Sequence, residues 1–236
     1  MDLKAIFEKV RLFAFENSMR DDIHGFKHTE RVLKQSLEIG IALNANLTVI
    51  KIATLLHDVG RNIKKGEFME NHAEISADIA ERFIYKENFN ITKEDIKNIL
   101  HSIRSHSFSN EKIPRTLEAK ILSDADKLDA LGAIGLYRTI GFTISRKGVL
   151  DDVIEHLENK ILKLKNQLFL DVSKEIANSR EKIVINFLPS FLFISLVIIQ
   201  VKSPLYSKKI MSFKKLSIFV KKRRKLFSSL TKMICF

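Results

Sequence analysis

A histidine and an aspartate stand side by side, as His57 and Asp58, at the end of an apolar segment. That segment, residues 51–61, reads KIATLLHDVGR, and its apolar spacing predicts a largely buried helix that stops near Gly60. Burying an unpaired carboxylate costs so much free energy that the group normally protonates, forms a pair or holds a cation. The carbonyl end of a helix also attracts a cation. The sequence therefore favours a metal site at this helix end.

Two more residues, His28 and Asp126, complete a candidate ligand set. Because neighbouring residues on a helix point about 100° apart, His57 and Asp58 can reach one ion only if it lies at the helix end. Two imidazoles and two carboxylates suit Mn, Fe, Co, Ni, Zn or Mg and are unsuited to soft copper. Such a set leaves coordination positions open for water and for a phosphate oxygen. The chemistry that follows is metal-assisted hydrolysis of a phosphoester, in which the ion lowers the pKa of the water and clamps the phosphoryl group.

The helical apolar period recurs along most of the first 190 residues, and the chain contains only eight Gly and three Pro. These features predict an all-α protein. We expect Thr48, Thr92 and Ser173 to act as helix N-caps, and Pro189 to kink or break the last helix. Small apolar residues in the segment 119–139 indicate close helix packing. The expected helices cover residues 1–16, 26–43, 48–58, 72–85, 92–103, 151–170 and 173–193.

Three motifs occur in order along the chain: HGFKHTERV, LLHDVGR and DADKLDA. Together they resemble the H…HD…D signature of the HD-domain metal-dependent phosphohydrolase superfamily, and the run DADKLDALGAIGLYRT resembles its small stand-alone bacterial and archaeal members. The resemblance covers roughly residues 20–190 and implies an all-α helical bundle with a central metal site. It implies four metal ligands, and it favours Asp126 over Asp124, because the family's ligand directly precedes a basic residue and a leucine. The implied ligands are His28, His57, Asp58 and Asp126.

The same resemblance draws attention to further residues. His72 and His106 fall where some HD families hold a second metal ion, although the residues after His106 contain no GYP motif, unlike the cyclic-di-GMP phosphodiesterase type. The alternative for each is an ordinary surface or hydrogen-bonded histidine, which we expect of His24 and His101. The candidate catalytic residues are Asp58 and Glu74, the latter as a general acid or base near His72. Four basic residues are candidates for binding the phosphate oxygens of a substrate, and the alternative for each is a salt bridge. They are Arg31, Arg61, Lys127 and Arg138.

The positive charge of the chain is concentrated at its C-terminal end. The net charge is +12, but residues 202–236 contain eleven Lys or Arg and no Asp or Glu, which leaves 29 basic and 28 acidic residues in the rest. We expect an HD phosphohydrolase domain over residues 1–194 and an apolar, then basic, extension over 195–236. The uncharged run 183–201 is just long enough to cross a bilayer, so membrane association is an alternative to completing the last helix. The basic part could contact anionic lipid or nucleic acid, or have no function.

Two features indicate a reducing compartment. The single cysteine, Cys235, cannot form an internal disulfide bond. The first residues, MDLKAIFEKVRLF, mix charge into their apolar positions and so lack the apolar region of a signal peptide. We therefore expect a cytoplasmic location.

The expected function is hydrolysis of a phosphoester or phosphoanhydride in a small molecule, typically a nucleotide, by metal-activated water. The cofactor would be a divalent Mn, Mg, Co, Fe, Ni or Zn ion. Three alternatives stay open: a cyclic-nucleotide phosphodiesterase, an alarmone hydrolase, and a non-catalytic metal-binding sensor that docks through its basic tail. A homo-oligomer is also compatible with the sequence.

Overall fold

The computed structural model describes residues 2–62, 72–107 and 112–201, and it describes side chains up to residue 188. Within these ranges the protein is all-α, as the sequence predicted, with one isolated β-bridge between Met19 and Gly25. The chain divides into two units, Met1–Leu188 and Pro189–Phe236. This division falls a few residues before the boundary expected at 194 and 195. All the candidate site residues belong to the first unit.

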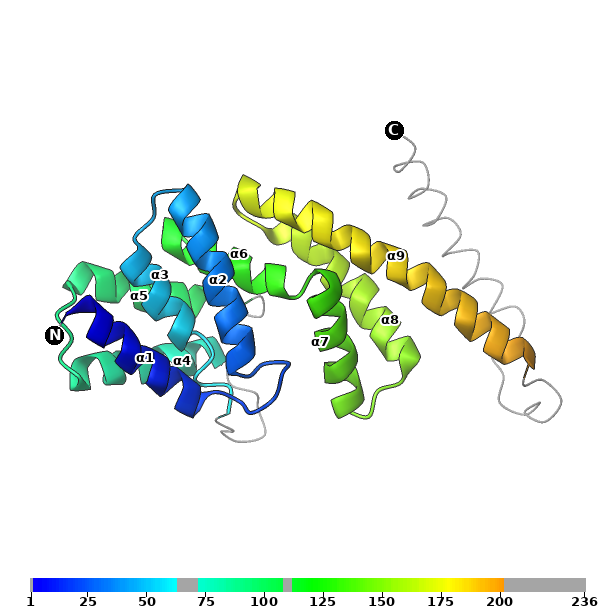
Figure 1. Cartoon of the computed structure of the whole chain (residues 1–236), viewed down its shortest axis with the longest axis horizontal. Helices are drawn as coiled ribbons and strands as arrows, with labels where there is room; N and C mark the ends of the chain where they lie inside the picture. Colours follow the sequence, from blue (N-terminus) through cyan, green and yellow to red (C-terminus); the bar gives the residue numbers. More distant parts are fainter. Residues whose placement is uncertain (1, 63–71, 108–111, 202–236) are drawn as a thin grey trace. The chain divides into compact units, whose positions relative to one another are not determined.

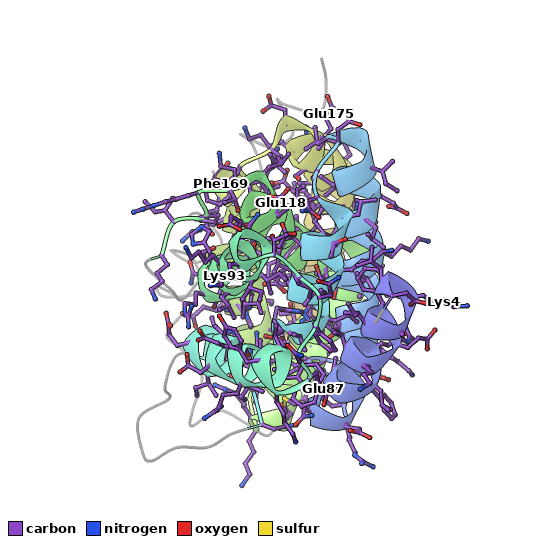
Figure 2. All side chains as sticks on the ribbon, turned by 90° about the vertical axis from the view of Figure 1, so that its left-hand side faces the viewer. Lys4, Glu87, Lys93, Glu118, Phe169 and Glu175 are labelled. Atoms are coloured by element: carbon purple, nitrogen blue, oxygen red, sulfur yellow. The ribbon has the colours of Figure 1, made fainter. Side chains whose placement is uncertain are left out.

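The site is built on a bundle of helices that surround α3 (Figure 1). The helix α3 contacts each of the other five in this bundle, and its residues Ile52, Ala53 and Leu56 are buried, as expected for a central apolar helix. Figure 2 shows the bundle from one side, with Lys93 at the start of α5 and Glu118 near the start of α6. The bundle comprises α1 (Leu3–Asn17), α2 (Phe26–Ala42), α3 (Leu47–Leu56), α4 (His72–Lys86), α5 (Lys93–Ser105) and α6 (Leu117–Asp129).

The rest of the described chain follows α6 as α7 (Gly132–Ser145), α8 (Leu150–Asn159), the 3₁₀ helix η1 (Ile161–Gln167) and α9 (Asp171–Val201). The helix α7 contacts α6 and α8, and α8 contacts η1. The helix expected over 151–170 is therefore shorter and gives way to a 3₁₀ segment. The segment 119–139 contains two helices, because Gly132 adopts a φ of +76°, a left-handed conformation that favours glycine.

The N-caps of α3 and α5 differ in how well the sequence predicted them. Oγ1 of Thr92 accepts a hydrogen bond from the N–H of Asp95 at 3.1 Å, as expected for the cap of α5. For α3, the expected cap Thr48 is wrong. The cap is Asn46, whose Oδ1 accepts from the N–H groups of Thr48 at 3.0 Å and Val49 at 3.2 Å. An asparagine oxygen two or three residues before these donors has the reach that a cap needs.

The last helix begins earlier and continues further than expected. It starts at Asp171, so Ser173 lies inside α9 and is not its N-cap. Of the kink or break expected at Pro189, the break is wrong, because helical conformation continues past Pro189 to Val201, and the kink stays a prediction. No helix in the described part of the chain is both long and apolar enough to cross a membrane.

The close approach of α3 to α4 depends on Gly60. Its N–H donates a hydrogen bond to Oγ of Ser76 at 2.9 Å, and a Cβ at position 60 would lie 2.7 Å from the backbone nitrogen of Ser76. Such a distance is too short for any side chain, so only glycine fits without a shift of the backbone. Because α4 begins at His72, this approach brings the end of α3 close to that histidine.

Candidate metal centre

Four histidines surround the carboxylate of Asp58. Oδ2 of Asp58 lies 3.8 Å from Nε2 of His28 and 3.6 Å from Nε2 of His57. Oδ1 lies 3.6 Å from Nε2 of both His72 and His106. His28 comes from α2, His57 and Asp58 follow α3, His72 starts α4, and His106 follows α5. Packing of four helices thus brings together residues that are far apart in the sequence.

These five side chains hold buried polar atoms that have no hydrogen-bond partner in the described part of the chain. The atoms are Oδ1 of Asp58 and the four histidine Nε2 atoms. Unsatisfied buried polar atoms are rare in folded proteins because each costs free energy. One ligand atom from each of His28, His57 and Asp58 lies within 4.8 Å of the others, and the same holds for Asp58, His72 and His106. Nitrogen and oxygen donors of this kind fit a divalent transition metal, so the cluster could hold one or two cations.

The rings of His57 and His106 are fixed by hydrogen bonds on their other nitrogen. Nδ1 of His57 donates to the carbonyl oxygen of Thr54 at 2.7 Å, and Nδ1 of His106 donates to that of Ile103 at 2.6 Å. Because a carbonyl oxygen only accepts, Nδ1 carries the proton and Nε2 keeps its lone pair, which faces Asp58. Metal-binding histidines are oriented in this way.

The protonation states also suit a cation. Burial lowers the pKa of His57 to about 4 and that of His72 to about 3, the latter with help from Arg61, so both imidazoles are neutral at pH 7. Burial alone would raise the pKa of Asp58, but the nearby Arg61 holds it well below its usual range. The imidazoles of His57 and His72 and the carboxylate of Asp58 are therefore deprotonated before any ion arrives, as metal binding requires.

The structure places Asp126 beside this cluster and Asp124 away from it. Oδ1 of Asp126 lies 3.2 Å from Nε2 of His28, although not in hydrogen-bond geometry. Burial would raise the pKa of Asp126, but the adjacent imidazole of His28 keeps it well below its usual range. Asp124 instead accepts hydrogen bonds from the backbone N–H groups of Phe169 and Leu170, each at 2.9 Å. The arrangement favours Asp126 as the carboxylate of α6 that meets the histidines.

Asp129 is a site residue to which the sequence analysis gave no role. Its Oδ2 accepts hydrogen bonds from Nδ1 of His28 at 2.7 Å and from Nη1 of Arg138 at 2.8 Å. Arg31 donates to both oxygens, from Nε at 2.8 Å and from Nη2 at 2.9 Å. Burial would raise the pKa of Asp129, but His28 and Arg31 hold it well below its usual range. The signal was available in the sequence, because residues three apart, such as Asp126 and Asp129, share one face of a helix.

The four basic residues considered for phosphate binding occupy different places. Arg31 and Arg138 bind Asp129, as described above. Arg61 donates from Nε to Oδ2 of Asp58 at 2.5 Å, so it contacts the cluster itself. Lys127 is buried, and its ammonium group donates hydrogen bonds to the carbonyl oxygen of Ser123, at 3.1 Å, and to Oγ of the same serine. The side chain of Lys127 therefore binds within its own helix, α6.

Glu74 and His101 both have protein partners outside the cluster. Glu74 forms ion pairs with Arg104, at 3.2 Å, and with Lys112. Two cations thus neutralise the carboxylate that was considered as a general acid or base. Nε2 of His101 accepts a hydrogen bond from the backbone N–H of Arg115 at 2.9 Å, as expected for a hydrogen-bonded histidine.

Comparison with known proteins supports the interpretation of these motifs. Residues 25–131 match the family model of the HD domain. The uncharacterized protein YpgQ of Bacillus subtilis is 28% identical over 172 residues, which cover 70% of this chain and 80% of that protein. A structure of B. subtilis YpgQ in complex with ADP superposes with a TM-score of 0.64 at 24% identity, covering 80% of this chain and 95% of that one.

A second solved structure is that of an HD-superfamily hydrolase from Bacillus thuringiensis. It superposes with a TM-score of 0.64 at 25% identity, over 81% of this chain and 97% of that one. The matched range 25–131 contains all five residues of the cluster as well as Asp126 and Asp129. Residues 25–131 therefore form an HD domain, and the resemblance indicated by the three sequence motifs is confirmed.

Proposed function

We propose that this protein is a metal-dependent phosphohydrolase that cleaves a phosphoester or phosphoanhydride bond of a nucleotide. The observation that carries the proposal is the set of unsatisfied buried ligand atoms around Asp58. The likeness to an HD-superfamily hydrolase supports hydrolysis as the reaction. The ADP bound to B. subtilis YpgQ supports a nucleotide as the substrate. We place this reaction in the cytoplasm.

In this proposal, His28, His57, Asp58 and Asp126 would hold one divalent ion, and Asp58, His72 and His106 would hold a second. A divalent cation bound here supplies an acidified water and polarises a phosphoryl oxygen.

The residues of the chain hold and orient these groups. Arg61 keeps Asp58 ionised and fixed, and the backbone carbonyls of Thr54 and Ile103 hold His57 and His106 with their lone pairs exposed. Of the four candidate basic residues, Arg61 is the one bonded to Asp58, so we assign to it the contact with the phosphate of the substrate. Arg31 and Arg138 act on His28 through Asp129. We assign no proton transfer to Glu74, because two cations hold its carboxylate.

The test combines metal analysis with a nucleotide panel. The full chain is assayed with Mn²⁺, Mg²⁺ and Co²⁺ against nucleoside mono-, di- and triphosphates, cyclic nucleotides and an alarmone. The product then identifies the reaction class, since phosphate, pyrophosphate and a linearised nucleotide are distinguishable. We expect His57→Ala to lower both the bound metal and the turnover by at least about a hundredfold.

A matched histidine variant controls for unfolding. His101→Ala removes a histidine outside the cluster and is expected to keep metal and activity. Equal activity of His57→Ala and the unchanged chain would refute the assignment of the site. Metal binding without turnover of any nucleotide would instead favour the non-catalytic sensor.

A further inference from the structure

A cavity of about 370 Å³ lies between α2, the junction of α6 and α7, and α9. None of the histidines of the metal centre lines it, and neither does Asp58. Its polar wall includes three cationic side chains, and part of the remaining wall is apolar. The cations are Arg31, Lys34 and Arg180, and the apolar side chains are Leu131, Ile134 and Ile183.

Within the described residues, no carboxylate accepts a hydrogen bond from Arg180. Its guanidinium donates to the carbonyl oxygen of Leu128 at 2.7 Å and to Oε1 of Gln35 at 2.5 Å, and both acceptors are neutral. Lys34 is exposed and makes no hydrogen bond or ion pair within the described ranges. The cavity therefore presents two cations whose charge remains available to a ligand.

The net charge of the residues that line the cavity stays positive when its acidic residues are counted. Its acidic residues are Glu38 and Asp129, and Asp129 is already bound by Arg31 and Arg138. The helix α7 starts at this cavity without a side-chain cap, which adds a small positive potential. An anion is thus the complementary ligand.

Arg31 connects the cavity to the metal centre. It lines the cavity and also binds Asp129, whose Oδ2 accepts the hydrogen bond from Nδ1 of His28 at 2.7 Å. An anion bound in the cavity would compete with Asp129 for Arg31. Asp129 would then bind the imidazole of His28 more strongly, and Nε2 of His28 would become a better donor to a cation.

We propose that this cavity is an effector site for a small phosphorylated molecule, and that Arg31 and Asp129 transmit its occupation to His28. Guanidinium and ammonium groups match phosphate oxygens. The volume exceeds that of a phosphate ion alone and lies within the range of about 300–1,000 Å³ found for small-molecule pockets, so the apolar wall would contact the rest of the molecule. Because coupling is reciprocal, the effector raises the affinity for the metal and the metal raises the affinity for the effector.

The cavity is tested without metal, so the result is independent of any hydrolase activity. AMP and adenosine are titrated into the full chain in the presence of a chelator, by isothermal titration calorimetry. We expect AMP to bind at least about tenfold more tightly than adenosine, and Arg180→Gln to weaken AMP binding about tenfold. Lys34→Gln, which removes an exposed ammonium group, is expected to weaken AMP binding about fivefold even if Arg180→Gln fails to fold.

The control is Lys4→Gln, an exposed lysine on α1 (Figure 2), which is expected to leave AMP binding unchanged. Equal binding of AMP and adenosine, or AMP binding that Lys34→Gln does not weaken, would overturn the cavity as the site.

The relay rests on the proposed metal-binding role of His28, and it is measured separately as the affinity for Mn²⁺ with and without AMP. We expect saturating AMP to raise the affinity for Mn²⁺ about fivefold. In Lys34→Gln the same gain should need about fivefold more AMP, because occupation of the cavity controls it. If AMP did not raise the affinity for Mn²⁺, the effector role would be overturned. It would also be overturned if Lys34→Gln reached the same affinity at the same AMP concentration as the unchanged chain, because AMP would then bind at the metal centre.

Discussion

At the scale of single residues, the state of His28 depends on Asp129. This one carboxylate accepts hydrogen bonds from His28, Arg31 and Arg138, and it is almost fully buried. A carboxylate bound to Nδ1 of a histidine fixes the ring and makes Nε2 a stronger donor to a metal. Asp129 is thus a positioning residue that acts through His28.

Replacing Asp129 by Asn should therefore weaken metal binding without touching a ligand. We expect Asp129→Asn to lower the affinity for Mn²⁺ by about 10–100-fold, measured by calorimetry. The free energy of unfolding in urea should fall by about 3 kcal/mol, because Arg31 and Arg138 lose a buried partner. Asp151→Asn, an exposed acid on α8, is the matched control. A folded Asp129→Asn protein with undiminished affinity for Mn²⁺ would contradict this role.

At the scale of elements, the contact between α3 and α4 determines whether His72 can reach Asp58. We expect Gly60→Ala to lower the free energy of unfolding by about 1–3 kcal/mol and to weaken metal binding, because the new Cβ would meet the backbone of Ser76. Gly141→Ala is the control, since its Cβ would meet only the side chain of Ile23, which can move. Equal effects of the two substitutions on metal binding would show that this contact does not position the site.

The start of α3 gives a second test at this scale. Asn46→Ala removes the cap of α3 and also a hydrogen bond from Nδ2 to Oδ1 of Asp95 on α5, at 2.9 Å. We expect it to lower the free energy of unfolding by about 1–2 kcal/mol, while Thr48→Ala has less than half this effect. Urea unfolding of both variants decides between the two candidate caps, and a larger loss for Thr48→Ala would reverse our assignment.

At the scale of the whole molecule, buried and half-buried neutral histidines make the metal-free chain sensitive to acid. Burial lowers the pKa of His24 and His57 to about 4 and that of His72 to about 3, from an ordinary value of 6.5. Between pH 6.5 and 4 the unfolded chain therefore binds more protons than the folded chain, so the free energy of unfolding falls as the pH falls. The pKa of His28 shifts in the opposite direction, because burial lowers it but the nearby carboxylates raise it by more. Protonation of His28 therefore offsets part of the loss in the free energy of unfolding.

The size of this effect can be measured by urea unfolding in a chelator at pH 7 and pH 5. One histidine with a folded pKa near 4 accounts for a loss of about 2 kcal/mol over this interval. We expect a net loss of at least this size for the whole chain. A free energy of unfolding that stays constant or rises on acidification would show that these histidines are not buried in their neutral form.

The charge of the whole molecule comes from residues 202–236, which lie outside the described residues. Contact of this basic stretch with anionic lipid or nucleic acid stays a prediction from its composition. The first 201 residues carry almost no net charge, so any such contact would come from electrostatic attraction to the last 35 residues and should weaken as salt is added.

The sequence by itself determined the all-α class, most of the helices and the identity of the central ligand candidates. Helical spacing of apolar residues and cap chemistry act over a few residues, so the helices and the cap at Thr92 could be predicted locally. The motifs around His28, His57 and Asp126 identified the HD domain for a related reason, because each motif is short and continuous.

Only the tertiary structure decided how these residues meet. His72 and His106 face the same oxygen of Asp58 because α4 and α5 both pack beside α3, which no local pattern encodes. Lys127 and Asp126 are adjacent in the sequence, but Lys127 binds Ser123 whereas Asp126 lies beside His28. Asp129 binds His28, which is 101 residues away along the chain. The physical reason is that hydrogen bonds and burial between helices depend on packing, whereas sequence patterns report only the interactions within each helix.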